Sequence, residues 1–244
     1  MRPMIKERSA WRICCGCGLA VAGIMGTKFP KDGAGYPKGP GDPVPAFEMA
    51  ASADDLTLVF GPFDDRRHAG RIAQMDEGNH WDYAFMLVYA AYLWTFYTAV
   101  RRETGRRARL LLGGLAIAAA LSDVIENGIL LRLTEDLAGA PDVESLAYPV
   151  WFKFLSLMIC GLGTGFFLLT RSQLLWRLAG VAVIAGSLAV AAAFVAPESH
   201  GQLLGKGLAI VWILQLVYAI VRGDVPVTPT GIDVKHLAHP VPAS

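Results

Sequence analysis

Long apolar runs separated by short polar segments dominate the pattern of this chain. Five of these runs follow residue 80, at 83–100, 110–131, 148–170, 178–195 and about 203–221. Each is close to the roughly 20 residues that an α-helix needs to cross a bilayer. A sixth, shorter run covers residues 13–25. The pattern predicts an all-α fold, a polytopic membrane bundle of six transmembrane helices.

The first run follows a basic segment that contains Arg2, Lys6, Arg8 and Arg12. A basic flank before an apolar core is typical of a signal peptide or a signal anchor. Residues 20–22, Ala-Val-Ala, could serve as a cleavage site, which would leave five spans. Because neighbouring apolar residues can extend the run to spanning length, we favour a retained anchor over residues 1–27.

Residues 28–80 form the long polar segment of the chain, and its Gly- and Pro-rich start predicts a loop. Residues 46–61 then become amphipathic, which predicts a short helix at the membrane surface or on the bundle. Its apolar face is formed by Phe47, Met49, Leu56 and Val59, and its wet face by Glu48, Asp54 and Asp55. A second polar helix is expected over 63–78. We therefore expect an extracytoplasmic cap over 28–80, a five-helix bundle over 81–222, and a disordered cytoplasmic tail over 223–244.

The low content of charged residues predicts a membrane protein, and their distribution predicts its orientation. Hydrophobic residues make up 54% of the sequence and charged residues only 18%, whereas a soluble domain has about 25% charged residues. The net charge of +1 gives no reason to expect a nucleic-acid partner. Residues 101–109 hold five arginines and one acid, and residues 133–147 hold four acids and no basic residue. The positive-inside rule then predicts a multi-pass protein of the cytoplasmic (inner) membrane, with both termini in the cytoplasm.

The third predicted span carries polar residues that are costly in a bilayer. Asp123, Glu126 and Asn127 fall within about one third of the helix circumference, so they face the bundle interior. Lys153 and Lys206 are expected at a similar depth in the outer half, which would make the group charge-balanced. The group could be a structural ion pair. It could also be a functional site that uses Glu126 or Asp123 as proton acceptor beside Lys153, or the lysines could merely reach the headgroups.

Metal and cofactor chemistry finds little support in the sequence. Cys14, Cys15 and Cys17 have no second Cys pair or nearby His to complete a metal site, and helix packing explains them better. His80 and His200 both fall near the outer interface, where lone histidines are more often hydrogen-bonding groups than ligands. No motif of the common hydrolases, zinc proteases or nucleotide-binding proteins is present. We therefore predict no metal and no cofactor.

Four segments carry a resemblance. They are PAFEMAASADDL, WDYAFMLVYAAYL, LSDVIENGILLRL and WFKFLSL, which together extend over residues 45–160. In this combination the chain resembles a group of small bacterial membrane proteins that share an outer Phe-Glu helix, an Asp-x-x-Glu-Asn span and a following Lys-bearing helix. The resemblance implies no activity. It does imply that Glu48 belongs with Asp123, Glu126, Asn127 and Lys153 in one constellation.

Three classes of function fit these observations. The leading expectation is a non-enzymatic membrane protein that binds a lipophilic ligand in its outer half or scaffolds a complex. Its partners would be membrane lipids, with a lipophilic small molecule or another membrane protein. The alternatives are a membrane-embedded enzyme that acts on a lipid or isoprenoid-like substrate through Glu126, Asp123 and Lys153, and a proton-coupled carrier of a small solute.

Overall fold

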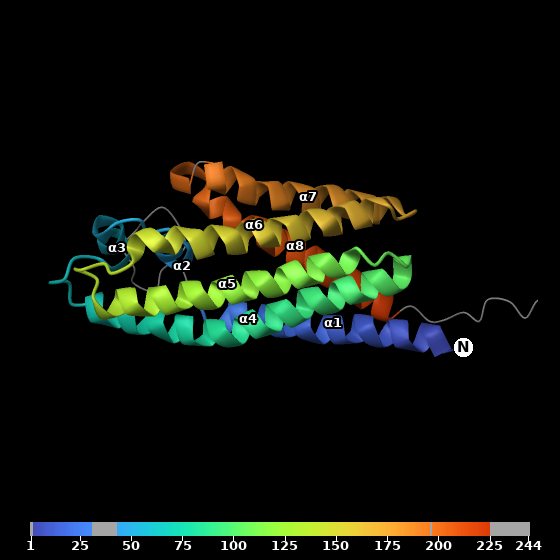
Figure 1. Cartoon of the computed structure of the whole chain (residues 1–244), viewed down its shortest axis with the longest axis horizontal. Helices are drawn as coiled ribbons and strands as arrows, with labels where there is room; N and C mark the ends of the chain where they lie inside the picture. The colour runs from blue at the N-terminus through green and yellow to red at the C-terminus, as the bar shows by residue number, and fades with distance from the viewer. Residues whose placement is uncertain (1, 31–42, 196, 225–244) are drawn as a thin grey trace, which may run out of the picture.

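The computed structural model describes residues 2–30, 43–195 and 197–224, which form eight helices (Figure 1). These are α1 (Arg2–Thr27), α2 (Pro43–Glu48), α3 (Ala53–Phe60), α4 (His68–Thr104), α5 (Arg109–Glu135), α6 (Val143–Leu169), α7 (Leu174–Val195) and α8 (Pro197–Asp224). Six of them, all except α2 and α3, are long and apolar enough to cross a membrane. The predicted all-helical, polytopic fold is therefore confirmed. The tail predicted to be disordered falls mostly outside the described residues.

The six long helices form a closed ring in which each packs against the next. α1 packs on α4, α4 on α5, α5 on α6, α6 on α7 and α7 on α8, and α8 returns to α1. The start of α1 and the end of α8 lie at the same end of the bundle, and α2 and α3 lie at the other end (Figure 1). We call the end with α2 and α3 the cap end.

The predicted single helix over 46–61 is wrong, because the chain breaks between α2 and α3. Ser52 is extended, with φ −151° and ψ 165°, and its hydroxyl accepts a hydrogen bond from the backbone N–H of Asp55. The Asp55 carboxylate in return accepts bonds from the Ser52 hydroxyl and from the backbone N–H of Ala51. Such a reciprocal cap satisfies the first free N–H groups of a new helix, so it starts α3 at Ala53 instead of continuing α2.

The predicted polar helix over 63–78 is also corrected. α4 runs without a break from His68 to Thr104, so the polar segment and the following span are one helix of 37 residues. The start of α4 is tied to the end of α3 by Arg71, whose guanidinium donates to the Phe60 carbonyl at 2.7 Å and pairs with Asp65 at 2.8 Å. The cap therefore rests on an extension of α4 beyond the apolar run.

α1 is an integral part of the bundle. Trp11 is 2% exposed and makes edge-to-face contacts with Phe96 of α4 and Tyr218 of α8. Cys14 is fully buried beside the Tyr92 carbonyl. Removal of α1 would therefore open the ring between α4 and α8.

Close helix contacts at α6, α7 and α8 depend on glycine. A Cβ on Gly165 would meet the Gly180 carbonyl at 3.0 Å, and a Cβ on Gly207 would meet the Gly186 carbonyl at 2.3 Å. Small residues at such crossings allow backbones to approach in a membrane, where the hydrophobic effect does not drive helices together. Gly165 on α6 and Gly207 on α8 therefore allow close approach to α7.

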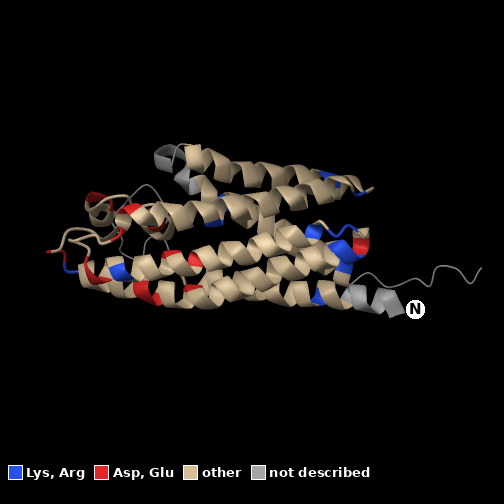
Figure 2. Cartoon of the chain, viewed as in Figure 1, with Lys and Arg blue, Asp and Glu red and all other residues tan. Residues whose placement is uncertain are grey.

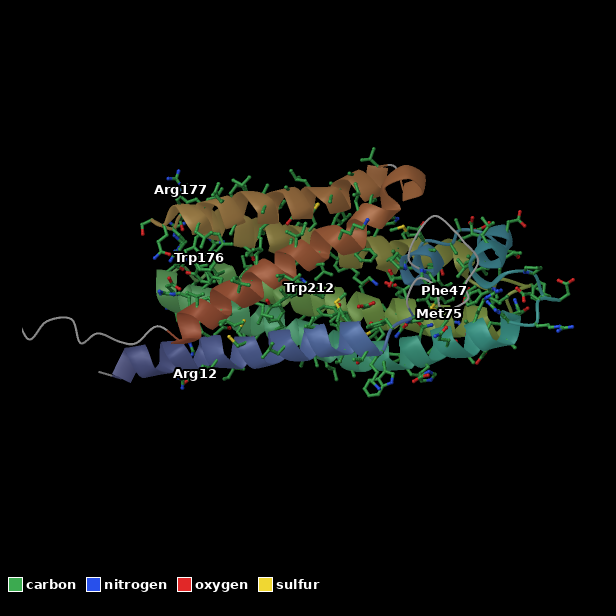
Figure 3. The ribbon with its side chains drawn as sticks, turned by 180° about the vertical axis from the view of Figure 1, so that it is seen from behind. Arg12, Phe47, Met75, Trp176, Arg177 and Trp212 are labelled. Carbon is green, nitrogen blue, oxygen red and sulfur yellow. The ribbon has the colours of Figure 1, made fainter. Side chains whose placement is uncertain are left out.

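Charged side chains gather by sign at the two ends (Figure 2). Most basic residues lie at the end opposite the cap, and most acidic residues lie at the cap end. We call the first the arginine-rich end; it contains the loop 105–108 and the turn 170–173. Phe47 and Met75 are labelled at the cap end in Figure 3, and both are fully buried there.

Candidate functional site

A buried lysine binds three carboxylates near the cap end. Lys153 Nζ lies 3.1 Å from Glu48, 3.0 Å from Asp123 and 2.8 Å from Glu126. The side chains of these four residues are between 1% and 12% exposed. We call this group the Lys153 cluster. The sequence placed its two α5 acids and the lysine together, and the resemblance added Glu48.

Three elements place the cluster. Asp123 and Glu126 are separated by one helical turn on α5, so both face α6. Lys153 follows Pro149 by one turn on α6, and Ser122 of α5 donates to the Pro149 carbonyl at 2.9 Å, which holds the two helices together. Glu48 is the last residue of α2. The amphipathic pattern placed it on a wet face, but the end of α2 directs it into the bundle.

Further polar contacts extend the site along α4 and α5. Tyr89 donates to Asp123 at 3.0 Å, and its ring stacks on Trp212 of α8 at a centroid distance of 5.8 Å. Asn127 donates to the Asn79 carbonyl at 2.7 Å. The site therefore contacts four of the six long helices as well as the cap.

Two buried polar atoms of the site have no hydrogen-bond partner among the described residues. They are Asn127 Oδ1 and Asn79 Nδ2. Asn127 is 1% exposed and Asn79 is 5% exposed. Because a buried unpaired polar group costs free energy, these atoms mark the part of the site that could accept a further polar group.

The cluster holds more acids than bases. Asp82, half-buried at the cap end of α4, lies close enough for its charge to act on Lys153, Glu48 and Asp123. Glu48, Asp82, Asp123 and Glu126 therefore surround one ammonium group. Lys206, which we expected to balance the charge, is exposed on α8 and has no ion pair within the described part of the chain. The structure does not bring Lys206 into the cluster.

Excess carboxylates in a buried site require protons or another cation. The carboxyl groups of Glu48 and Glu126 lie within hydrogen-bonding reach of each other, so they can share one proton. Burial is the largest influence on Glu48 and raises the pKa of its carboxyl group above its ordinary value of 4.5, although Lys153 opposes the shift. Glu48 therefore binds a proton more strongly than a free carboxylate would.

Two members of the site were missed by sequence reasoning. Asp82 and Tyr89 are seven residues apart, which places them on one face of a helix. That spacing can be read from the sequence. It does not by itself indicate a site, because Asp82 precedes the apolar run and tyrosine is common within spans.

The cysteines and histidines do not join this site. None of the four cysteines forms a disulfide, and no group of three potential metal ligands occurs among the described residues. His80 Nδ1 lies 2.6 Å from the Asp76 carbonyl of its own helix. The prediction for His200 is not tested, because its side chain is outside what the structure describes.

Comparisons with known proteins identify no relative of this chain. No protein-family model matches the chain, and no curated protein or solved structure matches it. The resemblance drawn from the four sequence segments stays a prediction. The function must therefore be argued from the site.

Proposed function

We propose that the protein is a non-enzymatic membrane scaffold protein in which the Lys153 cluster holds the cap helices α2 and α3 on the bundle. The observation that carries the proposal is that all three N–H donors of the Lys153 ammonium group bind carboxylates of the protein. Lys153 Nζ donates to Glu48 of α2 and to Asp123 and Glu126 of α5. An ammonium group has three donors. Lys153 therefore joins three elements and has no donor left for a substrate.

The same contacts argue against catalysis by Lys153. A lysine that acts as a nucleophile or a base must be a neutral amine. Three adjacent carboxylates stabilise the charged ammonium instead. Glu126 is 1% exposed, which leaves a general acid or base at this position little access to a substrate. The enzymatic alternative through Asp123, Glu126 and Lys153 is thus less well supported than the scaffold.

The proposed function includes the orientation of the protein in the membrane and its binding partners. Following the positive-inside rule, the arginine-rich end faces the cytoplasm and the cap faces outward from the bacterial inner membrane. The exposed aliphatic side chains of α7 contact lipid. In the described part of the cap, Leu58 and Phe63 are exposed large apolar side chains. Such a pair is suited to bind another membrane protein.

Site-specific crosslinking tests this function. A photoreactive residue in place of Leu58, in native membranes, should give an adduct with one defined protein. Lys153→Met should abolish the adduct and increase hydrogen exchange across residues 43–60, because the cap is no longer held. Lys206→Met removes an exposed lysine from the same end of the bundle and should change neither measurement. An unchanged adduct and unchanged exchange in Lys153→Met would contradict the proposal.

A second candidate, binding of a lipophilic ligand, is favoured by the unpaired buried atoms Asn127 Oδ1 and Asn79 Nδ2. A ligand with a polar head could pair with them and place its apolar body between helices. Native mass spectrometry of the detergent-solubilised protein should then show a bound small molecule that Asn127→Leu removes. The proton-coupled carrier stays a prediction, because a shared proton alone does not define a transport path.

A further inference from the structure

A second polar region lies at the arginine-rich end, far from the cap. A cavity of about 360 Å³ opens there between the C-terminal part of α4, the turn from α6 to α7, and the last turns of α8. It is lined by Glu103, Arg171, Ser172, Gln173, Trp176 and Arg222, among others. Figure 3 labels Trp176 at this end of the bundle. The volume is within the usual range for small-molecule sites, about 300–1,000 Å³.

The charges of this cavity do not balance. Arg171 and Arg222 both pair with the single carboxylate Glu103, Arg222 at 3.0 Å. Arg109 of α5 lies near enough to Arg171 for their like charges to repel each other. Arg171 and Arg222 therefore share one acid, and the charge of Arg109 adds to theirs. An anion bound in the cavity would relieve this repulsion.

The arginines also keep donors available. The Nε atoms of Arg171 and Arg222 have no hydrogen-bond partner among the described residues. The exposed Ser172 and Gln173 add side-chain donors at the mouth of the cavity. Guanidinium groups present their donors in a planar fork that matches the oxygens of a phosphate. The chemistry of the lining is thus that of a phosphate site.

The surroundings place this site at a membrane surface. Leu174 and Leu175, which directly follow the lining residue Gln173, are both exposed apolar side chains at the start of a spanning helix. Trp176 lines the cavity one residue later, and tryptophan is enriched at membrane interfaces. Acyl chains could therefore lie along α7 below a headgroup held in the cavity.

We propose that the cavity binds a phosphate group, that of an anionic phospholipid in the leaflet at the arginine-rich end. The phosphate lies between Arg171 and Arg222, with Ser172 and Gln173 as additional donors. A free phosphate would use the same contacts. This proposal stands independently of the scaffold function and of the Lys153 cluster.

Binding to the purified protein in a neutral detergent tests the proposal. The probes are dihexanoyl phosphatidylglycerol, dihexanoyl phosphatidylcholine and inorganic phosphate, titrated by microscale thermophoresis. Arg171→Gln should weaken binding of the anionic lipid about tenfold, the effect of losing a charge-assisted hydrogen bond. Arg177→Gln removes an exposed arginine of α7 that does not line the cavity, and it should leave binding unchanged.

Glu103→Gln should have the opposite effect on ligand affinity. Removal of the carboxylate frees both arginines for the ligand, so binding should tighten several-fold even if the variant melts at a lower temperature. A purely structural ion pair would instead lower the melting temperature in both Arg171→Gln and Glu103→Gln and leave binding unaffected.

The probes separate the sources of the phosphate. Tight binding of phosphatidylglycerol with weak binding of inorganic phosphate supports a lipid headgroup. Equal binding of inorganic phosphate supports the phosphate site and overturns the choice of a lipid. The absence of binding by either probe, or equal weakening by Arg171→Gln and Arg177→Gln, would overturn the site itself.

Discussion

Glu48 of α2 accepts a hydrogen bond from Lys153 of α6 at 3.1 Å, across 105 residues of the chain. Glu48 lies outside the six long apolar helices, whereas Lys153 is buried within one of them. The contact therefore connects the cap to the interior of the bundle. Because Asp123 and Glu126 bind the same ammonium group, any change in the charge of one member is felt by the others.

Substitutions within the Lys153 cluster should change the stability of the protein by unequal amounts. Lys153→Met removes the only ammonium group and leaves the carboxylates buried together, which should destabilise the protein by about 3–5 kcal/mol. Glu126→Gln removes one of several acids and mimics its protonated form, so it should change stability little or raise it. Thermal unfolding in detergent measures both variants, and Glu135→Gln, at an exposed position on the same helix, is the control for lost charge.

The double variant Lys153→Met/Glu126→Gln should recover part of the stability lost in Lys153→Met, because one fewer carboxylate is stranded. Equal destabilisation by the two single variants would contradict an excess of acids and would indicate a balanced ion pair instead.

Acidification should strengthen docking of the cap. Burial raises the pKa of Glu48 above 4.5, so the docked state binds its proton more tightly than the released state. The contribution of Glu48 to docking is thus fully present below pH 4.5 and is lost as the pH rises through the raised value. The protection factors of residues 43–60 in hydrogen exchange, which remove the intrinsic pH dependence of amide exchange, should fall as the pH rises. Glu48→Gln should flatten this dependence, and a dependence that persists in Glu48→Gln would assign it to another group.

Trp11→Ala should destabilise the bundle by about 3–5 kcal/mol, the range for truncation of a large buried aromatic residue. Trp11 fills the contact between α1, α4 and α8, so its loss leaves a cavity. Ile13→Ala, at an exposed position of the same helix, is the matched control and should melt like the wild type. If both variants melt alike, α1 contributes little to the ring.

Gly207→Ala should destabilise the protein by about 1–3 kcal/mol, as overpacking does. The new methyl group would lie 2.3 Å from the Gly186 carbonyl, and a backbone carbonyl cannot move aside as a flexible side chain can. Gly205→Ala, two residues earlier on α8, meets nothing within 4 Å and should be neutral. Equal melting temperatures for the two variants would show that α7 and α8 separate without cost.

The sequence predicted part of the site because some of its determinants are local. Asp123, Glu126 and Asn127 share a helix face by their spacing alone, and Lys153 was placed at their depth by the alternation of spans. Glu48 was expected on a wet face from its own helix pattern, and only the resemblance grouped it with the others. Its burial depends on the break at Ser52, which ends α2 before the amphipathic pattern is complete.

What the sequence by itself determined is the class of fold, the six apolar helices and the opposite charge of the two ends, because length, hydropathy and charge act residue by residue along the chain. The tertiary structure decided which lysine meets the acids, how many acids surround it, and that two arginines share one acid at a cavity. These outcomes depend on how the helices rotate and approach one another. Close contacts such as that between Gly186 and Gly207 determine this arrangement. Lys153 and Lys206 were equivalent in depth along the chain, and helix rotation alone placed one inside the bundle and the other on its surface.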